Sequence, residues 1–150
     1  MAPTLRERAL RYLARSEHSH AELARKLASH AESAEEIERL LDDLTGKQLL
    51  SDARYAEMRV TARGKRYGNA RLAHELRTQG IDEDTVAEAL TGNASEFVRA
   101  LAVWQRKFGK PAADTGEQAR QYNFLMRRGF SGDTIRRILR GDLPDDLPDA

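Results

Sequence analysis

The sequence contains no cysteine, and its 150 residues include only four prolines and 6% aromatic residues. The absence of cysteine excludes a disulfide framework, a thiolate zinc site and a thiol nucleophile. This scarcity, together with abundant Ala, Leu, Arg and Glu, favours helices over sheets. No stretch approaches the roughly 18 apolar residues of a membrane span, and the first residues show no apolar signal segment. We therefore expect an all-α protein that stays in the cytoplasm and does not contact a membrane.

Residue patterns of the common catalytic and metal sites are also missing. The three Gly-Lys pairs lack both the first glycine of a P-loop and the Ser or Thr that follows its lysine. The acidic runs 42–43 and 82–84 could suggest paired carboxylates, but the second run is better explained as complementing a helix dipole. No two histidines are spaced four apart, as a helical zinc site would require; they are His18, His20, His30 and His74. We expect no enzyme, no metal site and no cofactor.

A gap-free repeat of 49 residues organises the apolar positions. Each copy has apolar residues spaced four apart, a break of about ten residues, and further apolar residues at the same spacing. This pattern is typical of two amphipathic helices around a turn. The first copy holds Leu23, Leu27, Ile37 and Leu41, the second holds Leu72, Leu76, Val86 and Leu90, and the third holds Leu125, Ile135 and Leu139.

Helix stop and start signals recur in the same register. Gly80 and Gly129 suit the left-handed position that follows a helix end. Ser33, Asp82 and Ser131 suit the N-cap of the next helix, because their side-chain oxygens can accept an orphan backbone N–H. The coincidence of stop and start predicts a tight turn inside each repeat.

A further helical stretch precedes each helix pair, so each repeat contains three helices; these stretches are residues 5–14, 52–63 and 95–108. In the first repeat, Ser19 with Glu22 and Ser33 with Glu36 form two capping boxes, in which each side chain bonds the other residue's backbone N–H. We expect three tandem three-helix repeats in an elongated, curved array, followed by an acidic, disordered tail. The expected boundaries are 1–50, 51–93, 94–141 and 142–150.

The net charge of +1 hides an uneven distribution along the chain. It is −1 over residues 1–50 and zero over 51–93, whereas residues 94–141 carry ten Lys and Arg against four Asp and Glu. The tail 142–150 has four aspartates and no Lys or Arg. The basic excess therefore lies in the third repeat, beside a tail that could screen it.

Basic residues also gather on one face of the helix expected at 52–63. Tyr55, Arg59, Arg63 and Arg66 follow one another at helical spacing. Arginine outnumbers lysine, which suits two-point contact with carboxylates or phosphates. Any one of these arginines is equally well explained as solvating an outer helix face. Together they predict a surface for a protein partner or DNA, made of Arg59, Arg63, Lys65, Arg66, Arg71, Arg99, Arg106, Lys110, Arg127, Arg128, Arg136 and Arg137.

Two aromatic residues lie among these cations in the sequence. Tyr67 and Trp104 could stack on nucleic acid bases. Trp104 follows an apolar run, however, and is better explained as part of the core.

Four segments resemble motifs of the RecX family, in order across nearly the whole chain. They are RYLARSEHS at 11–19 with ELARKL at 22–27, LSDARYA at 50–56, ELRTQGI at 75–81 and FLMRRGFS at 124–131. The resemblance implies a regulator that lies in the groove of the RecA–DNA filament and modulates, usually inhibits, its ATPase, filament extension and strand exchange. These processes belong to recombination, DNA repair and the SOS response. The resemblance transfers no catalytic residue.

The expected partner is therefore the RecA nucleoprotein filament, with weak non-specific binding to single- or double-stranded DNA, and we expect a monomer. Two alternatives stay open. In a direct DNA-binding protein, each helix pair would act as a helix-turn-helix, with Arg136 and Arg137 reading bases. A purely structural adaptor would use the acidic face of Glu35, Glu36, Glu38, Asp42 and Asp43.

Overall fold

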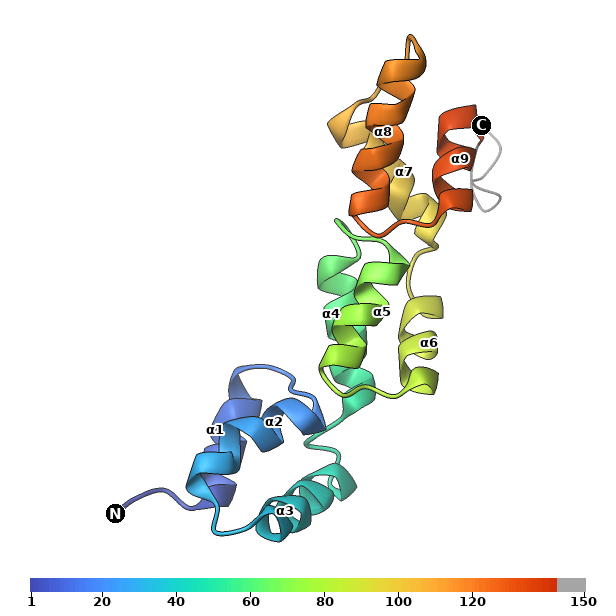
Figure 1. Cartoon of the computed structure of the whole chain (residues 1–150). Helices are drawn as coiled ribbons and strands as arrows, with labels where there is room; N and C mark the ends of the chain where they lie inside the picture. The colour runs from blue at the N-terminus through green and yellow to red at the C-terminus, as the bar shows by residue number, and fades with distance from the viewer. Residues whose placement is uncertain (143–150) are drawn as a thin grey trace. The chain divides into compact units, whose positions relative to one another are not determined.

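The computed structural model describes residues 1–142 (Figure 1). Within them the chain forms nine α-helices and one short 3₁₀-helix, and it contains no strand, so the all-α prediction is confirmed. The elements are α1 (Leu5–Arg15), α2 (His20–Leu27), η1 (Ala28–His30), α3 (Ala34–Gly46), α4 (Asp52–Arg63), α5 (Asn69–Thr78), α6 (Glu83–Thr91), α7 (Glu96–Lys107), α8 (Thr115–Arg127) and α9 (Gly132–Arg140). The predicted acidic tail lies, apart from Asp142, outside the described residues.

The helices form two compact units. Unit 1 comprises Met1–Met58 with Leu76–Ala89, and unit 2 comprises Arg59–Glu75 with Leu90–Ala150. The residues of the second predicted repeat are therefore divided between the two units. Among the helices of residues 1–142, none combines the length and apolar character that crossing a bilayer would require.

The core of unit 1 is built from α1, α2 and α3, and the apolar positions of the first copy of the 49-residue repeat lie in it. Leu23, Leu27 and Leu41 are completely buried, and Ile37 is 8% exposed. Burying a side chain of this kind stabilises a fold by about 1.5–3 kcal/mol. The other buried members of this cluster are Ala9, Leu40, Leu44 and Leu50.

The core of unit 2 is formed where α7, α8 and α9 contact one another (Figure 1). Its buried members are Phe97, Ala100, Val103, Leu125, Phe130, Ile135 and Ile138. Trp104 is half-buried against this cluster, and its indole Nε1 donates to Oε1 of the buried Gln121 at 2.9 Å. Trp104 thus packs against the core, as the sequence favours, but it is only partly buried there.

The predicted turn signals are confirmed as well. Gly80 and Gly129 have φ values of 79° and 90°. The side chains of Ser33, Asp82 and Ser131 accept from the backbone N–H three residues later, at 3.1, 2.8 and 3.2 Å. Each of these helices therefore starts with one orphan donor satisfied.

The capping boxes of the first repeat are only half formed. Ser19 and Ser33 do accept from the N–H groups of Glu22 and Glu36. The Glu36 carboxylate, however, accepts from the N–H of Glu32 at 2.9 Å and not from that of Ser33. The chain is extended at Ala31 and again at Ser33, and this places the Glu32 N–H within reach of that carboxylate.

Candidate functional site

The predicted basic residues are organised by a close backbone contact inside unit 2. The loop that follows α4 lies against the turn between α8 and α9: the N–H of Gly68 donates to the Arg128 carbonyl at 2.8 Å, and the N–H of Ala70 donates to the Gly129 carbonyl at 3.2 Å. A Cβ atom at position 68 would collide with the backbone of Gly129 and Phe130. Only glycine fits there, and the contact brings residues 65–67 next to Arg128.

Glu96, at the start of α7, bonds the beginnings of two helices at once. Its carboxylate accepts from the N–H of Asn69 at 2.7 Å, from the N–H of Ser131 at 3.0 Å and from the hydroxyl of Thr134 at 2.9 Å. Burial alone would raise the pKa of this carboxyl, but the hydrogen bonds from Ser131 and Asn69 outweigh it and hold the pKa below its ordinary value. The ionised carboxylate thus fixes α5 against α9.

Arg99 lies in the interior of unit 2, which corrects its placement among the surface cations. Its side chain is only 7% exposed, and burial lowers its pKa. Its guanidinium donates to the carbonyls of Gly64, Tyr67 and Ala94, at 3.1, 2.8 and 3.1 Å, and to the Asn69 side-chain oxygen. All of these acceptors are neutral, so the cation is satisfied by hydrogen bonds that also hold the loop after α4 in shape.

Three of the predicted basic residues converge on one carboxylate, Glu75. Arg63 makes a two-point contact with it, at 2.6 and 2.7 Å, while Arg71 and Arg59 approach to 3.6 and 4.0 Å. The hydrogen bond from Arg63 lowers the pKa of Glu75, and the same bond raises that of Arg63. We call these four residues the Glu75 cluster; its positive charge is partly neutralised within the fold.

Tyr67 is surrounded by guanidinium groups. Those of Arg71, Arg63, Arg128 and Arg66 lie 4.1, 4.6, 5.5 and 5.9 Å from the centre of its ring. Contacts of this kind attract a cation to the ring face. The ring therefore holds arginines in position and does not present a free face for stacking.

Two of these arginines, Arg66 and Arg128, also line a groove of about 590 Å³. We call it the basic groove; it is lined by Ala62, Lys65, Arg66, Val103, Arg106, Lys107, Phe124 and Arg128. Its lining, taken over the described part of the chain, contains five cationic side chains and no carboxylate. Within residues 1–142 none of these five cations forms an ion pair with an acidic side chain.

The cations of the groove are held by neutral groups. Arg106 donates to the Lys65 carbonyl at 2.7 Å, and Arg128 donates to the Arg66 carbonyl at 3.4 Å. Lys107 and Arg128 also lie 5.3 and 5.0 Å from the centre of the Phe124 ring. Because these contacts leave the positive charges uncompensated, the groove suits a partner that presents carboxylates or phosphates.

The remaining predicted residues lie outside the basic groove. Arg136 is paired with Asp133 at 2.6 Å, and the guanidinium of Arg137 lies 4.0 Å from the centre of the Phe97 ring. Lys110 and Arg127 are exposed on other parts of unit 2. The structure therefore brings together Lys65, Arg66, Arg106 and Arg128 and leaves these four apart.

Sequence reasoning missed two features. Lys107 and Phe124 line the groove but carry no signal in the sequence beyond the neighbouring Arg106.

A second basic surface lies on α1 in unit 1, where Arg8, Arg11 and Arg15 surround a small hollow with Tyr12. Its residues follow an i, i+3, i+7 spacing, which would have revealed a common helix face. We call this surface the α1 patch.

Comparison with family models places the whole helical array in one family. Residues 6–44 match the first three-helix domain of RecX, residues 51–90 match the second, and residues 94–139 match the third. A crystal structure of RecX from Lactobacillus salivarius has the same fold: it superposes with a TM-score of 0.81 at 22% identity, over 91% of this chain and 93% of that one.

Curated relatives agree over nearly the full length. The regulatory protein RecX of Ralstonia nicotianae is 51% identical over 139 residues, which cover 92% of this chain and 87% of the relative. The regulatory protein RecX of Chromobacterium violaceum is 42% identical over 144 residues, which cover 96% and 94%. This chain belongs to the RecX family of regulatory proteins.

Proposed function

We propose that this protein binds the RecA nucleoprotein filament through the basic groove and inhibits its ATPase, filament extension and strand exchange. Membership of the RecX family suggests the partner. The assignment of the groove as the binding surface rests on its five cations, which have no acidic partner within the described residues. Its setting is recombination, DNA repair and the SOS response, in the cytoplasm.

The groove is well prepared for a charged partner. Its loop is fixed by the Gly68–Gly129 contact and by the hydrogen bonds of Arg99, so little order has to be gained on binding. Within residues 1–142 no ion pair has to be broken before Lys65 or Arg66 meets a carboxylate or phosphate. Opposite charges across such a surface speed association and set the register of the complex.

The structure also changes which residues should be tested. Reversing the charge of Arg59, Arg63 and Arg66 together would dismantle the Glu75 cluster, because Arg63 holds that carboxylate at two points. A loss of inhibition in that variant could come from damage to the fold. Lys65, Arg66 and Arg106 are exposed, have no acidic partner among the described residues and line the groove, and so give a cleaner test.

The experiment measures the ATPase of RecA on single-stranded DNA while this protein is titrated in. For the K65E/R66E/R106E variant we expect the half-inhibiting concentration to rise at least about tenfold, which is ~1.4 kcal/mol of binding free energy. The matched control is R8E/R11E/R15E, which makes the same change of charge on the α1 patch. Inhibition at wild-type potency by the groove variant would overturn the groove as binding surface, and a wild-type protein without effect on RecA would overturn the proposed function.

A second candidate is direct binding to DNA, because a basic groove that includes an aromatic ring also suits a nucleic acid backbone. Its predicted readers are less suited, since Arg136 is paired with Asp133 and Arg137 lies over the ring of Phe97. A mobility-shift assay without RecA, over a series of salt concentrations, separates the two. Sequence-specific duplex binding would favour this candidate, whereas weak and steeply salt-dependent binding would be non-specific.

A further inference from the structure

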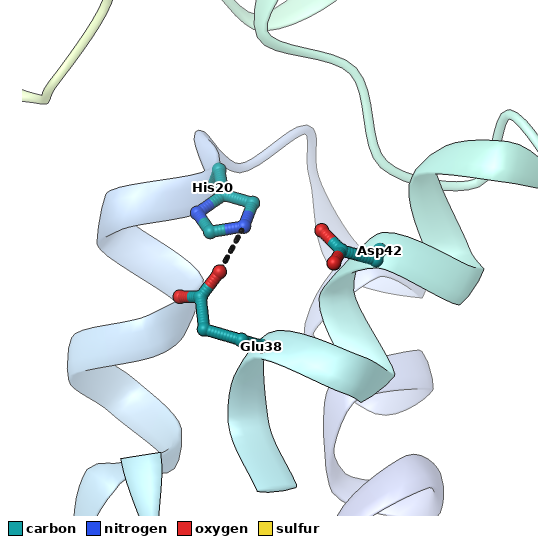
Figure 2. A group of neighbouring side chains, drawn as sticks. All are labelled: His20, Glu38 and Asp42. Carbon is teal, nitrogen blue, oxygen red and sulfur yellow. Dashed lines mark ion pairs between the residues drawn. The ribbon is translucent and has the colours of Figure 1, made fainter. Parts of the chain in front are cut away.

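A histidine and two carboxylates face one another in unit 1, and none of the three lines the basic groove. His20 is the first residue of α2, while Glu38 and Asp42 lie one turn apart on α3 (Figure 2). The Nε2 atom of His20 lies 3.4 Å from a Glu38 carboxylate oxygen. One ligand atom from each residue can be chosen so that all three lie within 4.8 Å of one another. Among the described residues this is the one group of three such side chains this close together.

Within the described part of the chain, Glu38 and Asp42 lack the cationic side chains that neutralise the neighbouring carboxylate, Asp43. Asp43, the next residue, is bound by Arg6 at 2.6 Å and by Lys47 at 3.0 Å, and these bonds lower its pKa. Within residues 1–142, Glu38 has only the imidazole of His20 as an ion-pair partner, and Asp42 has no ion-pair partner. Two acidic groups one helical turn apart repel each other, and a cation between them would relieve this repulsion.

The position of His20 is fixed by its backbone. Its N–H donates to the Asp52 carboxylate at 2.8 Å, and the preceding residue, Ser19, is completely buried while capping α2. The side chains of Glu38 and Asp42 are exposed, so they can rotate to complete a coordination shell. The backbone of the histidine is thus fixed before an ion binds, and the two carboxylate side chains can change their rotamers to reach the ion.

We propose that His20, Glu38 and Asp42 form a binding site for a divalent first-row transition metal ion, with zinc as the natural occupant. One imidazole nitrogen with two carboxylate oxygens suits zinc, cobalt or nickel, whereas magnesium and calcium prefer oxygen ligands alone. Zinc ligands lie about 2.0–2.2 Å from the ion, so rotation of the two exposed carboxylates would bring the three atoms together and water would fill the fourth position. The ion would join α2 to α3 and stabilise the first three-helix domain.

The proposal is tested on the full chain, with any affinity tag removed because oligohistidine binds the same ions. Isothermal titration calorimetry with Zn²⁺ should give one site per chain, and Co²⁺ should give visible absorption bands. For H20A and for E38Q/D42N we expect the dissociation constant to rise at least about tenfold, with loss of the Co²⁺ bands. Zn²⁺ should raise the melting temperature of the wild-type protein and not that of the variants.

The matched control is H30A, because His30 is an exposed histidine of the same unit that lies on η1 outside the cluster. It should bind zinc as the wild type does. Far-UV circular dichroism of each apo variant should match the wild type, which excludes unfolding as the cause of a loss. The absence of binding up to about 1 mM Zn²⁺ would overturn the proposal. Wild-type affinity in H20A, or an equal loss in H30A, would do the same. The site does not depend on RecA binding, so K65E/R66E/R106E should keep its zinc affinity.

Discussion

Arg63 ends α4 and Arg66 follows three residues later, yet the surroundings of their side chains differ in charge. Arg63 meets Glu75, which also draws in Arg59 and Arg71. Arg66 lines the basic groove, where five cations meet no carboxylate of the described residues. The difference is set by where the acidic residues lie, and not by the arginines themselves. It separates cations that stabilise unit 2 from cations that remain available to a partner.

The largest effect should come from the most deeply anchored cation. Replacing Arg99 by alanine leaves two loop carbonyls and the Asn69 side chain without their donor, and we expect the free energy of unfolding to fall by about 3 kcal/mol. Urea denaturation followed by circular dichroism measures this. Arg106→Ala, at an exposed position, should change stability by less than about 0.5 kcal/mol. Equal stabilities of the two variants would remove the distinction between anchored and available cations.

The next effect tests geometry without changing any charge. Gly68→Ala places a Cβ against the backbone of Gly129 and Phe130, and should cost about 2 kcal/mol because one of the two turns must move. It should also weaken inhibition of RecA, since it displaces Lys65 and Arg66 from Arg128. Gly46→Ala is the control: a Cβ there meets no atom within 4 Å, and it should leave stability equal or slightly higher. Unchanged stability of Gly68→Ala would contradict the close contact.

A smaller effect is expected at the Glu75 cluster. Glu75→Gln removes the charged acceptor of Arg63 and should cost about 1–2 kcal/mol near neutral pH. Because the folded pKa of Glu75 is lowered, this contribution is fully present above the unfolded pKa of about 4.3 and is lost as the pH falls through the folded value. Denaturation midpoints of the wild type and the variant should therefore converge as the pH falls through that folded pKa. Glu57→Gln, at an exposed carboxyl on α4, should show no such convergence.

The smallest effect should be that of the groove on stability. Reversing the charges of Lys65 and Arg66 breaks no ion pair within the described residues, so the free energy of unfolding should change by less than about 0.5 kcal/mol. Thermal melts beside those of Glu75→Gln give the comparison directly. A loss as large as that of Glu75→Gln would mean that the groove cations are structural after all.

Much of the fold is predictable from local patterns. The 49-residue register places leucines such as Leu23 and Leu125 in the two cores, and the caps at Asp82 and Ser131 are set by residues three positions apart. Such signals are short in sequence, because helical periodicity and capping act over one or two turns. Helical repeats can therefore be predicted from the sequence without knowledge of the tertiary structure.

The roles of the charged residues are less predictable. Arginine is a residue type usually found at the surface, yet Arg99 is buried. Its acceptors include the backbone carbonyls of Gly64 and Tyr67, more than thirty positions away in the sequence. Every residue has a backbone carbonyl, so the sequence does not show which ones accept from Arg99. The partner of Glu38 is His20, which lies on another helix. A search for two histidines four residues apart on one helix therefore does not find this pair. Which cations are paired is decided by tertiary contacts.

Trp104 gives the molecule an intrinsic optical probe. It is the sole tryptophan of the chain, and it lies in unit 2, half-buried and bonded to Gln121. Its fluorescence therefore reports the unfolding of the unit that carries the basic groove, whereas circular dichroism reports the helices of both units. Compact units of one chain can unfold at different denaturant concentrations. Comparing the two signals in one titration tests whether these units do so, without attaching a label.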